Sequence, residues 1–462
     1  MIRRTIERAL PRLLPWFCVL VVLRCGFNSL LVNAPLAWRG WAYIGVHFSL
    51  TLLMLGAWFG LHLHSSVLQT KQESTPNHLQ KQALLWVLIA GIVSRLLLID
   101  TPAFTTHDVQ RYLWDGAVAI NGLDPYRVAP DSPLAQTLRS YWPTPEEHAA
   151  YPTLYPPLAL ALFAFSALAG KTGGIWCWKI LVTAASLGSL LLGYRWLLRR
   201  GTPQHLPLLA LSPLLLLETG VGAHVDAFSA LAVIAALYAF ETGRRGTAGF
   251  LIGLGALIKL LPLVLLLPFS IYLLRARQVR QTCTLILGAL STVAIGYGLA
   301  LLLHLRPVGS IGLLFQRWRF GSPLYAALEA NFSMQTAAAL ALICLLMLLA
   351  ASAWHAWRAA TRQDLDISIS VQLALAAPLL VSPVTFPWYL CAFLPALLMR
   401  PRFSTLLWVS TVPLSYEVLN AFDSTGVWAP ATWPLWVIGF IILLGLLADV
   451  FRPSSRFWSL ER

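Results

Sequence analysis

Long apolar runs recur along the whole chain, and many are close to the roughly 20 residues that an α-helix needs to cross a bilayer. Hydrophobic residues make up 58% of the sequence and charged residues 11%, more apolar surface than a soluble core absorbs. The pattern predicts an all-α polytopic membrane protein with roughly 12–14 transmembrane helices. The simple spans are expected at 12–32, 41–63, 83–99, 175–197, 204–219, 225–241, 282–304, 335–357, 366–384, 387–400, 404–421 and 433–451.

Two further apolar stretches do not fit a simple crossing. Residues 152–170 are short and begin with several prolines, so we expect an interfacial or re-entrant helix on the outer face. Residues 247–274 lie between two basic clusters but are too short for two full crossings. Lys259, Pro262 and Pro268 interrupt this stretch, which predicts two short helices that meet near the outer leaflet with Lys259 at or near the turn.

Basic residues gather in short polar gaps between apolar runs, and this bias orients the chain. A net charge of +14 would suggest nucleic-acid binding in a soluble protein, but membrane proteins concentrate Lys and Arg in cytoplasmic loops. We therefore expect a multi-pass inner (plasma) membrane protein with both termini cytoplasmic and no nucleic-acid partner. The clusters are Arg3, Arg4, Arg8 and Arg12; Arg199 and Arg200; Arg244 and Arg245; Arg275, Arg277 and Arg280; Arg358 and Arg362; and Arg452 and Arg456.

This topology collects polar side chains on the outer, non-cytoplasmic surface. We expect two N-terminal helices and a cytoplasmic linker at 1–82, a catalytic core at 83–400 with an outer loop at 100–174, and C-terminal helices at 401–462. The segments expected to assemble one concave outer site are 100–151, 218–226, 306–333 and 382–389.

Two acids, Asp108 and Asp115, directly follow an apolar span in a chain with few charges. A partly desolvated carboxylate at the bilayer edge has a raised pKa and can take a proton from a hydroxyl, so Asp108 is the candidate general base. Asp115 lies two helical turns further on and could point the same way. Alternatively, Asp115 stabilises the loop through Arg111 or Arg127. His107 could orient Asp108 or share its proton.

Three cations are expected on the outer side, where the positive-inside bias disfavours them: Lys259, Arg317 and Arg319. A lipid phosphate would offset their cost, because Arg can bind it with two hydrogen bonds and Lys acts as a point charge. The alternative for all three is snorkelling to the interface.

Other side chains in the expected outer segments suit sugar binding. His224 and Asp226 fall in the 218–226 turn together with Glu218, and Trp388 lies in the 382–389 segment, where its ring could stack on a sugar. Metal-ligand spacing and phosphate-binding glycine loops are absent from the sequence. We therefore expect no metal and no cofactor.

Seven short strings between about residues 83 and 400 carry a family resemblance. They are Asp108-Val-Gln-Arg-Tyr112-Leu-Trp-Asp-Gly, Asn121-Gly-Leu-Asp-Pro-Tyr, Ala129-Pro-Asp-Ser-Pro, Tyr151-Pro-Thr-Leu-Tyr155-Pro-Pro-Leu-Ala, Gly222-Ala-His-Val-Asp-Ala, Gly255-Ala-Leu-Ile-Lys259 and Ser382-Pro-Val-Thr-Phe-Pro-Trp-Tyr. Together they resemble GT-C fold glycosyltransferases, and the nearest group is the polyprenyl-phosphate-mannose-dependent mannosyltransferases, glycosyltransferase family 87 and its bacterial relatives.

The resemblance implies an inverting transferase that uses a lipid-phosphate sugar on the non-cytoplasmic face. It also implies that Asp108 is the general base and that Lys259 lies near the donor phosphate. The chain departs from the simplest family pattern by two extra N-terminal spans and by His107, where relatives often have another acid. The expected substrate-binding residues are His107, Arg111, Tyr112, Asp115, Tyr155, His224, Asp226, Lys259, Arg317, Arg319 and Trp388.

The sequence thus predicts a membrane glycosyltransferase that moves mannose or another hexose from a polyprenyl-phosphate donor to a glycan, lipid or protein acceptor within the membrane lipids. One alternative is a transporter or flippase of a lipid-linked sugar, although such proteins usually show repeated halves that this chain lacks. A second alternative is a ligase that moves a preassembled glycan from a lipid pyrophosphate. The short late loops favour a monosaccharide donor.

Overall fold

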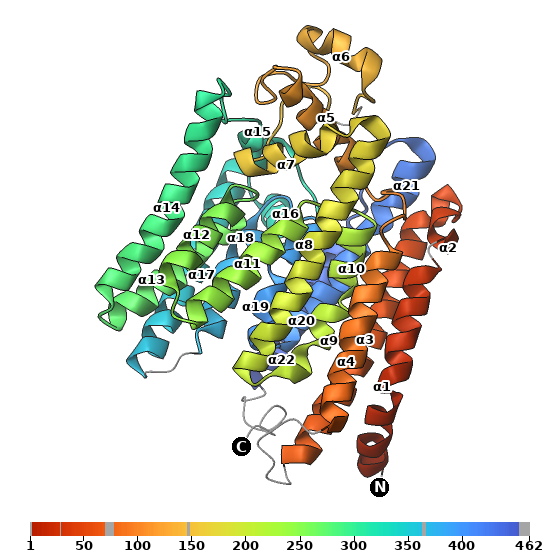
Figure 1. Ribbon diagram of the computed structural model, residues 1–462, viewed down its shortest axis with the longest axis vertical. Helices are drawn as coiled ribbons and strands as arrows, with labels where there is room; N and C mark the ends of the chain where they lie inside the picture. The colour runs from red at the N-terminus through yellow and green to blue at the C-terminus, as the bar shows by residue number, and fades with distance from the viewer. Residues whose placement is uncertain (1, 28, 70–77, 146–147, 363–365, 452–462) are drawn as a thin grey trace. The chain divides into compact units, whose positions relative to one another are not determined.

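The computed structural model describes residues 2–27, 29–69, 78–145, 148–362 and 366–451. Within these ranges the secondary structure is helical apart from one isolated bridge between Phe320 and Val384, which confirms the all-α prediction (Figure 1). Arg452 and Arg456, used above for orientation, lie outside the described residues, as do the side chains of Arg3, Arg4 and Arg8.

The helices fall into two compact units, and each is described by itself. The first unit comprises residues 1–102, 186–221 and 397–462. Its elements are α1 (Ile2–Gly26), α2 (Ser29–Val32), η1 (Leu36–Trp38), α3 (Arg39–Gln69), α4 (His78–Leu97), η3 (Pro203–His205), α9 (Pro207–Ala210), α10 (Pro213–Gly220), α20 (Phe403–Thr411), η6 (Val412–Glu417), α21 (Val418–Thr425) and α22 (Trp433–Phe451).

The second unit comprises residues 103–185 and 222–396. Its elements are α5 (Asp108–Ile120), η2 (Pro133–Ala135), α6 (Gln136–Tyr141), α7 (Pro157–Ala167), α11 (Asp226–Glu241), α12 (Arg245–Ala256), η4 (Leu261–Leu265), α13 (Leu266–Arg275), α14 (Val279–Leu302), α15 (Ile311–Arg317), α16 (Pro323–Asn331), α17 (Met334–Thr361), α18 (Ser368–Val381) and η5 (Pro387–Cys391). The unit boundaries fall inside α8 (Gly170–Arg200) and α19 (Leu394–Met399). The functional division at 1–82, 83–400 and 401–462 stays a prediction.

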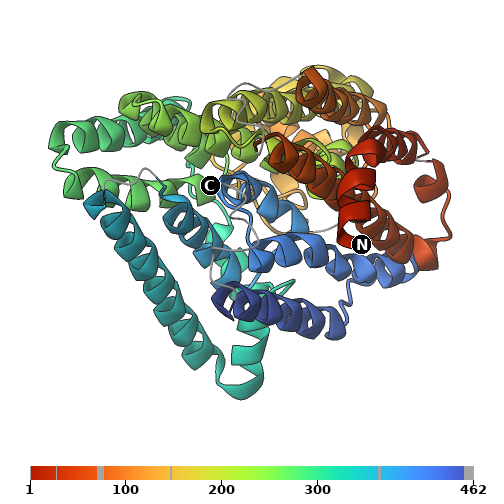
Figure 2. The same cartoon turned by 90° about the horizontal axis from the view of Figure 1, so that it is seen from below.

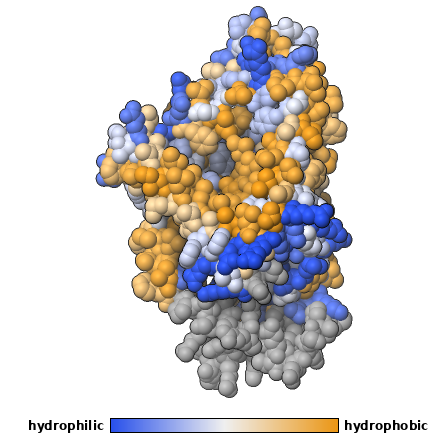
Figure 3. Space-filling view, turned by 90° about the vertical axis from the view of Figure 1, so that its left-hand side faces the viewer, coloured by the Kyte–Doolittle hydropathy of each residue, from blue (hydrophilic) through white to orange (hydrophobic). Residues whose placement is uncertain are grey.

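Six helices in the described part of the chain are long and apolar enough to cross a membrane. They cover 36–63, 80–97, 170–200, 279–302, 334–361 and 433–451, and each coincides with an expected span. On the face shown in Figure 3, apolar side chains cover the middle and hydrophilic ones gather towards the ends. The chain is therefore a multi-pass membrane protein.

Four other expected spans are not continuous helices, and the first of them, 12–32, is divided between α1 and α2. The expected span 204–219 is divided into η3, α9 and α10, 387–400 into η5 and α19, and 404–421 into α20, η6 and α21. Prolines begin several of these pieces, because proline has no N–H for the helical ladder and its ring clashes with the preceding turn. Residues 204–227 are all buried, and interrupted backbone at membrane depth is tolerated only inside protein or along a cavity.

The two stretches that did not fit a simple crossing form short helices, and their expected places at the outer face stay predictions. The first forms the short helix α7, of 11 residues. The second forms α12, a turn containing Lys259, and then η4 and α13. Within this unit α14 packs along α12 and α13, and α13 packs on α17 (Figures 1 and 2).

A buried arginine satisfies the carbonyl groups at one helix break in the first unit. Arg95 on α4 is 2% exposed and donates to the carbonyl oxygens of Ala210 (2.8 Å) and Leu209 (3.2 Å), at the end of α9. It also donates to the carbonyl oxygen of Gly91 (2.8 Å) and to Ser186 Oγ (2.9 Å). The guanidinium thus replaces helical N–H donors that the break removes.

Replacing this arginine should destabilise the fold. Arg95→Met leaves buried carbonyl oxygens without donors, and we expect a loss of roughly 3 kcal/mol, since hydrogen bonds to charged groups are worth about 1.5–3 kcal/mol each. Arg95→Lys should lose less. The measurement is the melting temperature of purified protein in detergent, with the exposed Arg199→Met as the control. Equal melting temperatures for Arg95→Met and Arg199→Met would contradict this account.

Candidate active site

Helix α5 begins at the candidate base, Asp108. An acid in the first turn is stabilised by the helix dipole, and the Asp108 N–H donates to Thr106 Oγ1 at 3.2 Å. The buried face of α5 packs on α7, where the backbone of Phe163 lies so close that a Cβ at Gly116 would collide with its carbonyl. Glycine at position 116 therefore allows the approach that fixes the start of α5.

The carboxylate of Asp108 has one oxygen engaged and one open. Its Oδ2 lies 3.2 Å from His224 Nδ1 and accepts from the hydroxyl of Tyr112 at 3.1 Å. Among the described residues, Oδ1 has no hydrogen-bond partner, and the side chain is 28% exposed. One oxygen is thus held by the protein while the other can receive a proton.

The electrostatics of Asp108 differ from the sequence expectation. Burial raises the pKa of this carboxyl, but the hydrogen bond and charge of His224, with Lys259 and Tyr112 nearby, hold the pKa below its ordinary value. The expected raised pKa is therefore wrong, because the partners of the carboxylate outweigh its desolvation. Asp108 is ionised at neutral pH.

His224 is fixed by the turn between α10 and α11. Ala223 adopts a left-handed conformation (φ 50°), and its carbonyl oxygen accepts from Trp178 Nε1 at 2.8 Å. The imidazole stacks on Trp388, with 3.9 Å between ring centroids and 9° between planes. Phe386 also stacks on Trp388, with 4.4 Å between centroids, and the indole is buried. This tryptophan therefore supports His224, and its role in sugar stacking stays a prediction.

An ion pair between Asp226 and Lys259 lies close to the contact of Asp108 with His224. Lys259 Nζ donates to both carboxylate oxygens of Asp226, at 2.7 and 2.8 Å. The ammonium also lies 3.8 Å from the ring centroid of Tyr389. Asp226 is buried, whereas the Lys259 side chain is 20% exposed. Lys259 is therefore held within the protein rather than extended to an interface.

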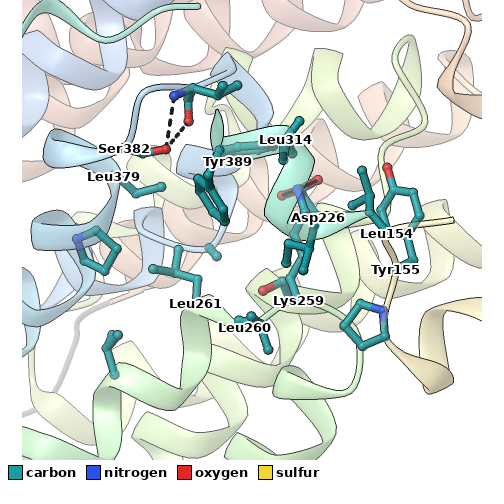
Figure 4. A pocket seen from close by; sticks show the side chains of 18 residues that line it. Leu154, Tyr155, Asp226, Lys259, Leu260, Leu261, Leu314, Leu379, Ser382 and Tyr389 are labelled. Atoms are coloured by element: carbon teal, nitrogen blue, oxygen red, sulfur yellow. Dashed lines mark hydrogen bonds and ion pairs between the residues drawn. The ribbon is translucent and has the colours of Figure 1, made fainter. Parts of the chain in front are cut away.

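These residues border an apolar cavity of about 260 Å³ (Figure 4). Tyr155 connects the cavity to the base, because its hydroxyl lies 3.5 Å from that of Tyr112. Burial keeps the pKa of both tyrosines well above the ordinary value, so both stay protonated. The lining residues are Leu154, Tyr155, Pro156, Asp226, Ser229, Lys259, Leu260, Leu261, Val264, Ile311, Leu314, Phe315, Pro378, Leu379, Ser382, Val384, Tyr389 and Ala392.

Tyr389 and Ser229 bring further polar groups to the cavity and were not among the expected site residues. Tyr389 directly follows Trp388 in a string that was singled out, but the sequence does not show that its ring meets Lys259. Ser229 lies three residues after Asp226 on α11, a spacing that places both on one helix face. Its buried hydroxyl has no hydrogen-bond partner in the structure and borders the cavity.

The second acid of α5, Asp115, has a separate environment. It is 1% exposed and pairs with Arg111, whose Nε lies 2.9 Å from Oδ1. Arg111 also donates to the carbonyl oxygens of Tyr151 (2.7 Å) and His148 (3.3 Å). Burial raises the pKa of Asp115, and Arg111 opposes that shift. The geometry favours the loop-stabilising alternative, and a substrate contact at either residue stays a prediction.

The remaining expected site residues are not among the described residues that line the cavity. Arg317, on α15, is exposed and donates to the hydroxyl of Tyr151 at 3.1 Å. Arg319 donates from Nε to both carboxylate oxygens of Glu329 at 2.7 Å. His107 is exposed immediately before α5. Glu218, expected beside His224, instead accepts from Tyr416 at 2.6 Å within the first unit.

The assembled groups can remove a proton and stabilise an anion. The open oxygen of Asp108 is a proton acceptor, and Lys259 supplies a positive charge at a cavity whose other walls are largely apolar. Within the described ranges, no cluster of three or more His, Cys, Asp or Glu side chains is arranged to hold a metal ion.

Removing Arg111 should destabilise the 100–151 loop. Arg111→Met leaves a buried carboxylate at Asp115 without its cation, and we expect a loss of about 3 kcal/mol, typical of breaking a buried pair. Arg127→Met, at an exposed arginine of the same loop, is the matched control. The measurement is the melting temperature of each variant. Equal melting temperatures for Arg111→Met and Arg127→Met would contradict the stabilising role of Arg111.

Comparison with known proteins agrees with the chemistry of the site. The model of glycosyltransferase family 87 matches residues 153–383, half of the chain. This region includes Tyr155, His224, Asp226 and Lys259. Neither the curated proteins nor the solved structures gave a match. The family match confirms the resemblance seen in the sequence, and the chain belongs to glycosyltransferase family 87, as a membrane glycosyltransferase that uses a sugar donor and an acceptor.

Proposed function

We propose that the protein transfers a hexose, with mannose as the first candidate, from a polyprenyl-phosphate donor to a hydroxyl of a glycan, lipid or protein acceptor. The transfer proceeds by a single displacement that inverts the anomeric configuration. The observation that carries the proposal is the open oxygen of Asp108 beside a cavity that holds the Lys259 ammonium. The family assignment supports a glycosyl transfer at this place.

In the proposed reaction, Asp108 Oδ1 accepts the proton of the acceptor hydroxyl. The hydroxyl oxygen forms a bond to the anomeric carbon, and the bond from that carbon to the phosphate oxygen breaks. The electron pair leaves with the lipid phosphate, whose added charge is stabilised by Lys259. His224 and Tyr112 hold Oδ2, so the free oxygen keeps one direction throughout the step.

A lipid-linked donor suits the cavity better than a nucleotide sugar does. Leucine, valine, isoleucine and proline side chains form much of the wall next to Lys259. Such a wall accommodates hydrocarbon, while the single ammonium provides one site for a phosphate charge. Arg111 and Arg319 are paired with Asp115 and Glu329. Arg317 is not among the residues that line the cavity, so a pyrophosphate would find little further compensation there.

The proposed location is the inner (plasma) membrane, with both termini cytoplasmic and the cavity on the non-cytoplasmic side. The arginines at the ends of α8 and α13, with the basic pair before α12, support this orientation. No metal and no cofactor is proposed to take part.

The direct test is transfer of labelled sugar by purified protein in lipid. Synthetic polyprenyl-phosphate mannose, glucose and arabinose serve as donors, and a membrane extract supplies acceptors. We expect the wild type to use one hexose donor and Asp108→Asn to lose transfer by roughly 10²–10⁴-fold, the usual contribution of a general base. The substitution keeps the shape of the side chain and removes its basicity.

Asp131→Asn is the matched control, since Asp131 is an exposed acid of the same outer loop. It should transfer sugar like the wild type. A folded, active Asp108→Asn variant would show that another group is the base. Donor binding without transfer by the wild type points to a missing acceptor or to lipid-linked sugar transport, and a flipping assay separates these outcomes.

The pH dependence of transfer tests the partners of Asp108. In the wild type the lowered pKa keeps the carboxylate ionised across the neutral range, so activity should fall only in strongly acid solution. His224→Phe preserves stacking on Trp388 but removes the hydrogen bond and charge, leaving burial to raise the pKa of Asp108. We expect the acid limb of the residual activity to move to higher pH.

Tyr112→Phe removes the weakest of the interactions that lower the pKa of Asp108. The acid limb of its activity should therefore move less than that of His224→Phe. An unchanged acid limb in His224→Phe would contradict the assigned electrostatics.

A further inference from the structure

The ammonium of Lys259 is held from two sides by the protein itself. Asp226 accepts two hydrogen bonds from it, and the face of Tyr389 lies 3.8 Å away (Figure 4). An ammonium carries three N–H donors, so one remains for a ligand. All three side chains border the cavity, which leaves the remaining donor close to any anion bound there.

The ring of Tyr389 is fixed independently of Lys259. It meets Phe386 edge to face, with centroids 5.7 Å apart and planes at 77°, and Trp388 at 6.2 Å and 84°. Trp388 in turn stacks on His224, which touches Asp108. One aromatic cluster therefore supports both His224, the partner of Asp108, and Tyr389, whose ring face contacts the Lys259 ammonium.

A lysine side chain has a flexible four-carbon stem, so a salt bridge alone leaves its ammonium several positions. A ring face attracts a cation along one direction, most strongly where water is excluded. The ring of Tyr389 disfavours conformations of Lys259 in which the ammonium points away from the cavity. Asp226 disfavours conformations in which the ammonium leaves the ring face. Together, the two contacts fix the position of the ammonium relative to the negative charge that develops on the leaving phosphate.

We infer that Tyr389 is a positioning residue for Lys259, which it holds at the lipid-phosphate position through a cation–π contact. The inference rests on the proposed function, because it deepens the role given there to Lys259. It assigns to the string Ser382–Tyr389 a part in the transfer that the neighbouring Trp388, which is buried against His224 and Phe386, does not supply.

A double-mutant cycle tests the coupling. The variants are Tyr389→Phe, Tyr389→Leu, Lys259→Met and Lys259→Met with Tyr389→Leu, assayed for kcat and KM with the donor that the wild type uses. We expect Tyr389→Leu to lower kcat/KM for the donor about tenfold and Tyr389→Phe to retain most of it, because phenylalanine keeps the ring face. In the Lys259→Met background the leucine change should cost less than about twofold.

A second readout does not depend on transfer. Lysine acylation by a small reagent, followed by mass spectrometry, should label Lys259 several times faster in Tyr389→Leu than in Tyr389→Phe, since the ring no longer holds the ammonium. Other exposed lysines of the same sample give the reference rate.

The outcomes separate the inference from the function on which it rests. An equal loss for Tyr389→Leu with and without Lys259, or equal labelling in the Phe and Leu variants, overturns the positioning role. If no polyprenyl-phosphate donor is used, or if Lys259→Met leaves donor kcat/KM unchanged, the proposed function fails. Ring-dependent labelling would in that case still establish the contact.

Discussion

Backbone hydrogen bonding at interrupted helices is the constraint on which this structure depends. In an apolar surrounding every freed carbonyl needs a donor from the protein. Trp178 supplies one to Ala223, the N–H groups of Leu158 and Ala159 supply two to Leu257, and Arg95 serves the end of α9. The first two breaks place His224, Asp226 and Lys259 within the second unit. The positions where the helices stop are therefore the positions where polar side chains reach the cavity.

Contacts between acidic and basic side chains govern how these side chains behave. Asp108 lies against His224, Asp226 against Lys259, and Asp115 against Arg111. Each pairing offsets the cost of removing a charge from water, but they leave different groups free. Asp115 is enclosed with its partner and stabilises the loop. Asp108 keeps one oxygen open and Lys259 one donor, so a proton acceptor and an anion site remain available at the cavity.

The sequence predicted what depends on the length and polarity of segments. Six apolar runs became continuous helices, and the turn at Lys259 followed from the basic clusters around a stretch too short for two crossings. The expected spans 204–219, 387–400 and 404–421 are broken by prolines. Hydropathy did not predict these breaks, because it reports the polarity of side chains and not the effect of proline on the backbone. The four expected outer segments were grouped by topology. Residues from 218–226, 306–333 and 382–389 border one cavity, whereas none of the lining residues comes from 100–151.

Contacts between distant segments could not be predicted in the same way. Asp108 and His224 are 116 positions apart, so the partner that lowers the pKa of the base has no local signal. The orientation of side chains was equally hidden: Trp388 is buried against His224 and Phe386, and its neighbour Tyr389 contacts Lys259 instead. For Asp115, two readings were open, and only the position of Arg111 favours one of them.

The measurement that tests the account most directly is a structure of the protein with a polyprenyl-phosphonate sugar, a donor analogue that cannot transfer. The account predicts the phosphonate next to Lys259 and Tyr155, the lipid along the apolar wall, and the anomeric carbon on the side of Asp108 Oδ1. A phosphonate bound away from Lys259, or a sugar out of reach of Asp108, would contradict it.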